Sequence, residues 1–238
     1  MEWRVCYLDA ILVPLGLLIN GAYHAFLWHK LRERPLVTVI GTNSRVHRLW
    51  VLAIMKDNNT KNILAIQTLR NTIMGATLMA TTSILLCSAL AAVLSSTYSI
   101  KKPLNEAIYG AHGEFALALK YVTLLVMFLF SFLCHSLSIR FINQVNILIN
   151  SPQVEVYQGF TLTPEYVADI LERGFILNTV GNRIFYVAMP LLLWIFGPVL
   201  VFFCSVTLVP VLYNLDFMPG NGAMAGKVDD TRKGMESA

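Results

Sequence analysis

Residues 115–142 read FALALKYVTLLVMFLFSFLCHSLSIRFI, and this stretch decides the fold class of the chain. It exceeds the roughly 20 apolar residues that carry an α-helix across about 30 Å of hydrocarbon. Three further apolar stretches of similar length lie at 5–28, 72–98 and 184–213. Only 13% of the residues are charged, against about 25% in soluble domains. The sequence therefore predicts an all-α polytopic membrane protein with four transmembrane helices.

The four predicted spans form one membrane domain, residues 1–216, and leave long loops at 29–71 and 143–183. A Gly- and Met-rich tail at 217–238 is expected to be disordered. Eleven Lys and Arg lie from Lys30 to Arg70 and from Arg140 to Arg183, against six on the opposite side. Because cytoplasmic loops attract positive charge, both long loops are predicted to be cytoplasmic and both termini non-cytoplasmic.

The first long loop contains apolar residues at helical spacing, from Val46 to Ile54. They predict an amphipathic helix that starts near Ser44. This helix either lies on the cytoplasmic leaflet or docks against the second loop. A second helix is predicted to begin near Thr60 and to run continuously into the membrane.

The second loop carries a helix start at Thr163-Pro164-Glu165: a capping threonine, a proline in the first turn and an acid near the positive helix end. This helix is predicted to end near Arg173, where Gly174 interrupts it. Glu165, Asp169 and Glu172 make the second loop more acidic than the first. The two loops are therefore suited to dock electrostatically.

Two of the predicted spans carry polar faces, which are candidates for a permeation path. One face, on the second span, consists of Arg70, Thr77, Thr81 and Ser88. The other, on the third span, consists of Lys120, Thr123, Ser131 and His135. An ionisable residue within a span is expensive and so indicates function. The alternative is close helix packing, because small residues let membrane helices approach one another.

Two histidines offer a cofactor hypothesis. His24 in the first span and His135 in the third are predicted to lie at similar depth, because the two helices run in opposite directions. Such a pair resembles the way helix bundles hold a haem iron. The alternative is that each imidazole is hydrogen-bonded to a neighbouring Asn or Ser.

Four further basic residues are candidates for binding lipid phosphates or helix ends: Arg45, Arg48, Arg140 and Arg183. The positive loops are expected to meet the lipid bilayer rather than nucleic acid, for which the chain carries no motif. No P-loop, GxSxG, HExxH or EF-hand pattern is present, and no catalytic residue or metal ligand is predicted.

Several motifs resemble one known family. They are QTLRN at 67–71, Ser138-Ile139-Arg140 with Asn143 and Asn146, and Gly181-Asn182-Arg183 with Tyr186, Pro190, Trp194 and Gly197-Pro198. With these motifs the chain resembles the domain-of-unknown-function 599 membrane proteins of land plants, up to about Asp216. The resemblance implies a multi-span plant membrane protein and supplies no site residues.

Three functions remain open from the sequence. The leading one is a homo-oligomeric channel or transporter for small anions, with cationic side chains at both mouths of the path. The second is a haem-binding redox protein that uses His24 and His135. The third is a non-catalytic scaffold or auxiliary subunit that presents its cytoplasmic helices to a partner.

Overall fold

The computed structural model describes residues 2–56, 62–99, 114–151, 155–157 and 160–217. Within these residues the chain is helical apart from one short antiparallel pair, β1 (Glu155–Tyr157) and β2 (Phe160–Thr161). The helices are α1 (Glu2–Glu33), η1 (Pro35–Val37), α2 (Val39–Lys56), α3 (Asn62–Ser99), α4 (Glu114–Leu148), α5 (Pro164–Leu192), η2 (Leu193–Ile195) and α6 (Pro198–Asp216).

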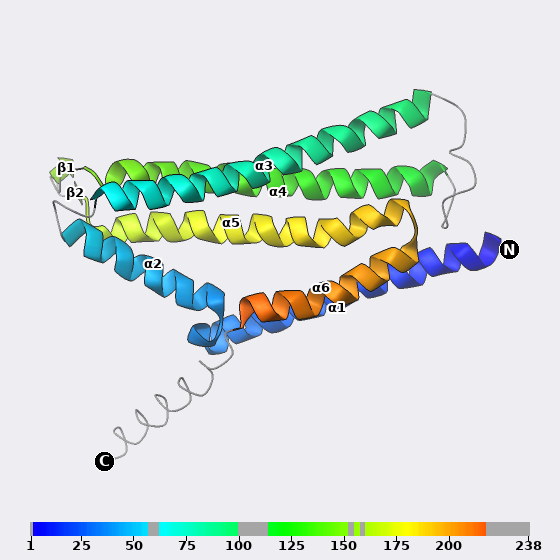
Figure 1. Cartoon of the computed structure of the whole chain (residues 1–238), viewed down its shortest axis with the longest axis horizontal. Coiled ribbons are helices and arrows are strands. Elements are labelled where there is room, and N and C mark those ends of the chain that lie inside the picture. Colours follow the sequence, from blue (N-terminus) through cyan, green and yellow to red (C-terminus); the bar gives the residue numbers. More distant parts are fainter. Residues whose placement is uncertain (1, 57–61, 100–113, 152–154, 158–159, 218–238) are drawn as a thin grey trace, which may run out of the picture.

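Five of these helices, α1, α3, α4, α5 and α6, are long and apolar enough to cross a membrane. Figure 1 shows α3, α4 and α5 side by side, while α6 packs along α1 and α2 crosses obliquely. The prediction of a helical chain with several helices suited to cross a membrane is confirmed. The predicted number of such helices, four, is wrong, because the described residues contain five.

The error lies in the last predicted span, residues 184–213, which is not one helix. The chain reverses at Gly197, so that 184–192 belongs to α5 and 198–213 to α6. Gly197 has φ 151°, a backbone conformation that residues with a Cβ rarely adopt. Pro198 then begins α6, since proline is suited to the first turn of a helix. Gly197-Pro198 is therefore a turn between two helices and not a kink within one.

The second long loop, predicted at 143–183, is mostly helix. The start of α5 is confirmed, because Thr163 caps it by accepting a hydrogen bond from the backbone nitrogen of Tyr166. Gly174 does not end this helix as predicted. Its missing side chain lets α4 approach closely: an added Cβ would lie 3.0 Å from Ile142, and the Gly174 carbonyl accepts from Ser138 at 2.7 Å.

The start of α1 and the end of α6 lie at opposite ends of the bundle (Figure 1). The expectation that both termini share one side depended on an even number of spans, and it no longer follows from five. The tail that was predicted to be disordered is 217–238, and all of it except Phe217 lies outside the described residues. Phe217 is described, and its backbone nitrogen bonds to Tyr213.

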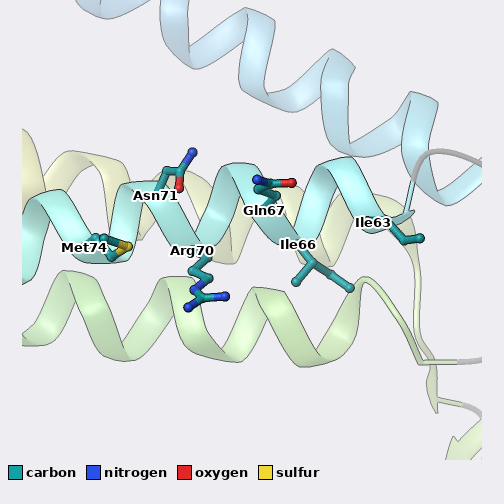
Figure 2. Close-up of a pocket in the computed structure, with 6 residues that line it drawn as sticks. All are labelled: Ile63, Ile66, Gln67, Arg70, Asn71 and Met74. Atoms are coloured by element: carbon teal, nitrogen blue, oxygen red, sulfur yellow. The ribbon is translucent and has the colours of Figure 1, made fainter.

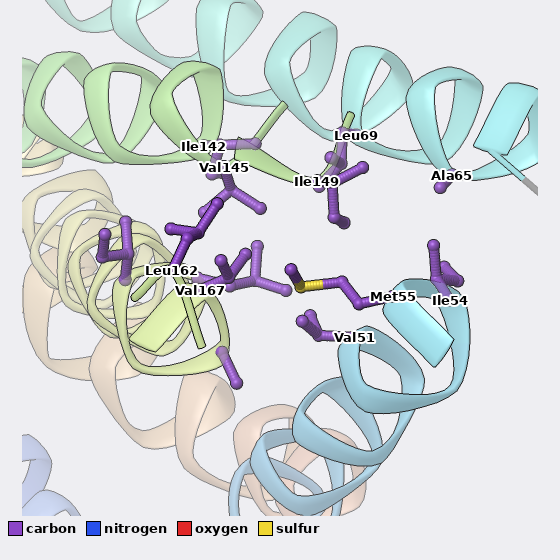
Figure 3. Close-up of a cluster of buried hydrophobic side chains, with 13 residues drawn as sticks. Val51, Ile54, Met55, Ala65, Leu69, Ile142, Val145, Ile149, Leu162 and Val167 are labelled. Carbon is purple, nitrogen blue, oxygen red and sulfur yellow. The ribbon is translucent and has the colours of Figure 1, made fainter. Parts of the chain in front are cut away.

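The first long loop contains the expected amphipathic helix, although α2 begins at Val39 rather than near Ser44. Of the two placements predicted for it, the structure shows docking on the chain's own second loop. Val51, Ile54 and Met55 of α2 enter a core with residues of α3, α4 and α5 (Figure 3). Burying three such side chains contributes about 1.5–3 kcal/mol each in transfer free energy.

Polar contacts also join α2 to α5. Arg48 forms an ion pair with Asp169 at 3.1 Å, and the Ser44 hydroxyl donates to Glu172 at 2.5 Å. His47 stacks on Phe175 with ring centroids 3.9 Å apart. The acidic face predicted on the second loop thus meets the basic face of α2. The Arg48 pair is exposed, so it adds little to the apolar contact.

Docking of α2 is expected to weaken as the pH falls below about 6.5, the ordinary pKa of histidine. Burial lowers the pKa of His47, and the carboxylate of Glu172 acts in the opposite direction. The undocked helix therefore takes up a proton more readily than the docked one, so the contribution of His47 to docking is fully present above this pH and declines as the pH falls below it.

The measurement is a distance distribution between spin labels at Arg45 and Arg173, recorded at pH 7.5 and 5.5. The distance distribution of the wild-type protein should broaden at the lower pH. His47→Phe keeps the stacked ring and removes the titrating group, so it should give the same distribution at both values. A wild-type distribution that does not change with pH would contradict the role given to His47.

Candidate functional site

A buried ion pair lies near one end of the bundle, where the sequence placed a cationic mouth. Lys120 of α4 bonds to Asp9 of α1 at 3.1 Å, and both side chains are less than a tenth exposed. The indole nitrogen of Trp194 donates to Asp9 at 3.2 Å, and the Lys120 ammonium lies over the Trp194 ring. The charge of Lys120 is therefore neutralised, and the cluster ties α1, α4 and η2 together.

A second buried polar layer joins α3, α4 and α5. The Ser131 hydroxyl donates to the Gly181 carbonyl at 3.1 Å and lies 3.2 Å from the hydroxyl of Ser83. His135, one turn further along α4, is fully buried. Ser131 and His135 are thus brought together as predicted, but they face α5 rather than an open path.

Both ring nitrogens of His135 are engaged. Nδ1 lies 2.7 Å from the Ser131 carbonyl oxygen, and Nε2 lies 3.1 Å from Oδ1 of Asn182. Both ring nitrogens are therefore occupied by contacts within the bundle, and neither is open to a metal.

His24 differs, because only one of its nitrogens is bonded. Nδ1 lies 2.7 Å from the Asn20 carbonyl, whereas Nε2 is buried without a partner in the described part of the chain. A haem would need Nε2 of both histidines, and His135 uses its own within the α4–α5 interface. The pair therefore does not fit a bis-histidine haem site.

A third buried cluster joins Arg183, a residue that the sequence singled out, to Asp216 and Tyr23, which it did not. Arg183 of α5 pairs with Asp216 at the end of α6, and the Tyr23 hydroxyl of α1 donates to the same carboxylate at 2.5 Å. Arg183 was expected to meet lipid phosphates. It instead closes a neutral contact between three helices.

The polar face predicted on the second span points outward. Arg70, Thr77, Thr81 and Ser88 are all exposed on α3, the edge helix whose main neighbour is α4. Thr77 and Ser88 donate to backbone carbonyls one turn earlier, at 2.8 Å each. The structure thus separates this face from the buried face of Lys120, Ser131 and His135.

The remaining predicted residues lie at the surface or close to it. Thr123 is half-buried and bonds within its own helix, Leu119 being its acceptor at 2.7 Å. Arg45 and Arg140 are exposed. Arg48 is also exposed, but it forms the ion pair with Asp169. These arginines remain candidates for contact with lipid headgroups.

A shallow hollow of about 390 Å³ opens beside Arg70. Figure 2 shows its lining on one stretch of α3, with Arg70 and Ile66 on the side toward the green ribbon of α4 and Asn71 on the other side. Its walls combine three polar and three apolar side chains: Gln67, Arg70, Asn71, Ile63, Ile66 and Met74. Among the described residues no acidic side chain forms an ion pair with Arg70.

The residues that sequence reasoning missed are mostly partners of residues that it found. Asp9, Asn182 and Asp216 complete the clusters of Lys120, His135 and Arg183. A charge of opposite sign at a matching depth on another span was the available signal for Asp9. No comparable signal existed for Asp216, because its partner lay in a segment predicted to be a loop.

Five helices that are long and apolar enough to cross a membrane, with neutral polar clusters between them, are consistent with an all-helical membrane protein. A family model for a protein of unknown function, DUF599, matches residues 11–220. The chain belongs to that family, which confirms the resemblance in its motifs; its plant source stays a prediction. No curated protein and no solved structure matches the chain.

Proposed function

We propose that this protein is a homo-oligomeric membrane channel or transporter for small anions, with its path between copies along the outer face of α3. The observation that carries the proposal is Arg70, an exposed cation without an acidic partner in the described chain, at one end of a row of exposed hydroxyls. A polar row of this kind is poorly matched to lipid and well matched to a path.

A path between copies is favoured over one inside a single chain. The interior polar groups bond mainly to one another, and Lys120 and Arg183 are each neutralised by an aspartate. Anion attraction therefore rests on Arg70 and not on Lys120. Gly75, exposed with no atom within 4 Å of an added Cβ, offers the close approach that neighbouring membrane helices use.

We further propose that the end of the bundle holding α2 faces the cytoplasm. The α2 helix, the β1–β2 pair and the end of α6 lie at one end of the bundle (Figure 1), so the tail with Lys227, Arg232 and Lys233 follows from there. Arg4, Lys101 and Lys102 are then the basic residues left for the opposite side. The positive-inside rule favours this orientation, with the N-terminus outside and the C-terminus inside.

Anion flux through reconstituted protein tests the proposal. Arg70→Glu should lower chloride and nitrate flux by about tenfold, since it replaces local anion attraction with repulsion, and should shift the reversal potential toward cations. Arg173→Glu is the matched control, because Arg173 is also exposed at the same end but lies on α5.

Correct assembly is checked first, by mass and by cross-linking through a cysteine at Thr81. An oligomer that passes this check and conducts no anion between pH 5.5 and 8 would contradict the proposal. Equal anion flux in Arg70→Glu and Arg173→Glu would contradict a path along α3.

A scaffold role is the second candidate, and one observation favours it. Val46 and Leu49 on the outer side of α2 are 54% and 59% exposed at the same end of the bundle. Exposed apolar side chains of this kind mark contact surfaces when they cluster. Co-purification of a stoichiometric partner that is lost in Leu49→Ser would support this second role.

A further inference from the structure

We infer that the hollow beside Arg70 binds an organic oxyanion: a phosphate-type group carried on an apolar body. The inference deepens the proposed function, because it names the class of anion that the mouth of the path recognises. It rests on the hollow itself, on the side chains around it and on its depth along α3.

The polar lining supplies donors in a geometry suited to oxyanions. Gln67, Arg70 and Asn71 follow one another at i, i+3 and i+4, so all three line the hollow. Figure 2 shows Arg70 on the side toward α4 and Asn71 on the opposite side of α3. A guanidinium offers a rigid fork of N–H donors that matches two oxygens at once, and each carboxamide adds two more donors. A halide, a single sphere, uses such a fork poorly.

The arginine is available to a ligand. Three described aspartates are paired with other cations: Asp9 with Lys120, Asp169 with Arg48 and Asp216 with Arg183. Arg70 is exposed and takes part in none of the ion pairs among the described residues. No described carboxylate therefore compensates its charge, and an uncompensated cation attracts anions.

The apolar lining indicates what the oxyanion is attached to. Ile63 and Met74, which flank the polar groups, are 76% and 61% exposed, and Ile66 lies between them. Inorganic phosphate would leave these side chains in water. A hydrocarbon chain beside the phosphate would cover them and gain about 25 cal/mol per Å² of buried apolar surface.

The depth of the hollow places it at a membrane surface. Ser83, in the polar layer between α3, α4 and α5, lies near the middle of the apolar stretch Ile63–Ser96 of α3. From Ser83 to Arg70 the axis of α3 advances about 20 Å at 1.5 Å per residue. This exceeds half of the roughly 30 Å hydrocarbon thickness. Both a phospholipid headgroup and a soluble phosphate ester can therefore reach Arg70.

The test measures binding of labelled hexyl phosphate to the purified oligomer in phosphatidylcholine nanodiscs. Arg70→Gln should weaken binding by about tenfold, the loss expected for one charged hydrogen-bonding group, while Arg173→Gln should leave it unchanged. Gln67→Ala should weaken it less. Hexanol, which has no charge, and chloride, which has no apolar body, should compete poorly.

Phosphatidic acid in the nanodisc distinguishes the two sources. If it displaces hexyl phosphate, the natural occupant is a lipid headgroup; if it does not, the occupant is a soluble phosphate ester. Equal binding by the two arginine variants, or displacement by chloride at the concentration of hexyl phosphate, would overturn the inference. Binding without flux would reject only the channel proposal, and flux without binding would reject only this site.

Discussion

Replacing Lys120 with Met is expected to lower the free energy of unfolding by about 3–5 kcal/mol, because it removes the ammonium that pairs with the buried Asp9 carboxylate. The two side chains are 4% and 8% exposed, so water cannot take the place of the ammonium. Trp194 keeps its hydrogen bond to Asp9, but a neutral donor does not replace the lost charge.

The double variant Asp9→Leu with Lys120→Met separates charge pairing from packing. It removes both charges and keeps apolar bulk, so it should lie within about 1–2 kcal/mol of wild type, since such replacements of buried pairs are often close to neutral. The measurement is a reversible denaturant titration in micelles. The importance of the buried ion pair would be contradicted if Lys120→Met were as stable as wild type. It would also be contradicted if the double variant lost as much free energy of unfolding as the two single variants together.

The pair also changes what a charge reversal at this site means. If Lys120 were a free cation at the mouth of a path, Lys120→Glu would alter ion selectivity and leave assembly intact. With Asp9 at 3.1 Å, that variant brings two carboxylates together inside the bundle. We therefore expect failed assembly rather than altered selectivity.

Gly181→Ala is expected to destabilise the protein by about 1–3 kcal/mol through overpacking. Its added Cβ would lie 2.7 Å from Cε1 and 2.8 Å from Nδ1 of His135, and 3.1 Å from Cβ of Cys134. The His135 ring is held by bonds at both nitrogens and cannot turn away without breaking one. Gly181→Val, with its larger side chain, should destabilise the protein more than Gly181→Ala.

Gly21→Ala is the matched control, since an added Cβ there has no atom within 4 Å. It should be neutral or slightly stabilising, because alanine favours a helix over glycine. Thermal unfolding of the three variants in one detergent makes the comparison. The clash would be refuted if Gly181→Ala and Gly21→Ala had the same midpoint, or if His135→Ala did not relieve the effect of Gly181→Ala.

Local patterns predicted the elements whose signals are themselves local. The long apolar stretches became α1, α3 and α4, and the capped start at Thr163 became the start of α5. The basic and acidic faces of the two loops predicted the docking of α2 on α5, because complementary charges are visible in the sequence.

The reversal at Gly197 could not be predicted in the same way. A Gly-Pro pair within an apolar stretch is compatible with a kinked helix and with a turn, and the choice depends on tertiary contacts. The middle of α5 contains Asn178, Asn182 and Arg183, and these polar residues made the segment look like a loop. Asn182 and Arg183 meet His135 and Asp216, partners that lie far away in the sequence.

The polar faces show the same limit. Spacing correctly grouped Thr77, Thr81 and Ser88 on one side of α3, and Ser131 with His135 on one side of α4. Periodicity states which residues share a face and not what the face meets. One face turned out to be exposed and the other buried, a difference that only the packing of helices decides.

Thiol labelling at Phe196 tests most directly whether the chain crosses the membrane five times. Phe196 is 60% exposed at the turn between η2 and α6, whereas a single span over 184–213 would hold it in mid-membrane. In a Cys-free chain, a cysteine at Phe196 should react with an impermeant reagent applied outside intact cells. Cysteines at Arg45 and Thr163 should react only after permeabilisation. Protection of residue 196 from both sides, with residues 45 and 163 labelled together, would contradict the five-span bundle.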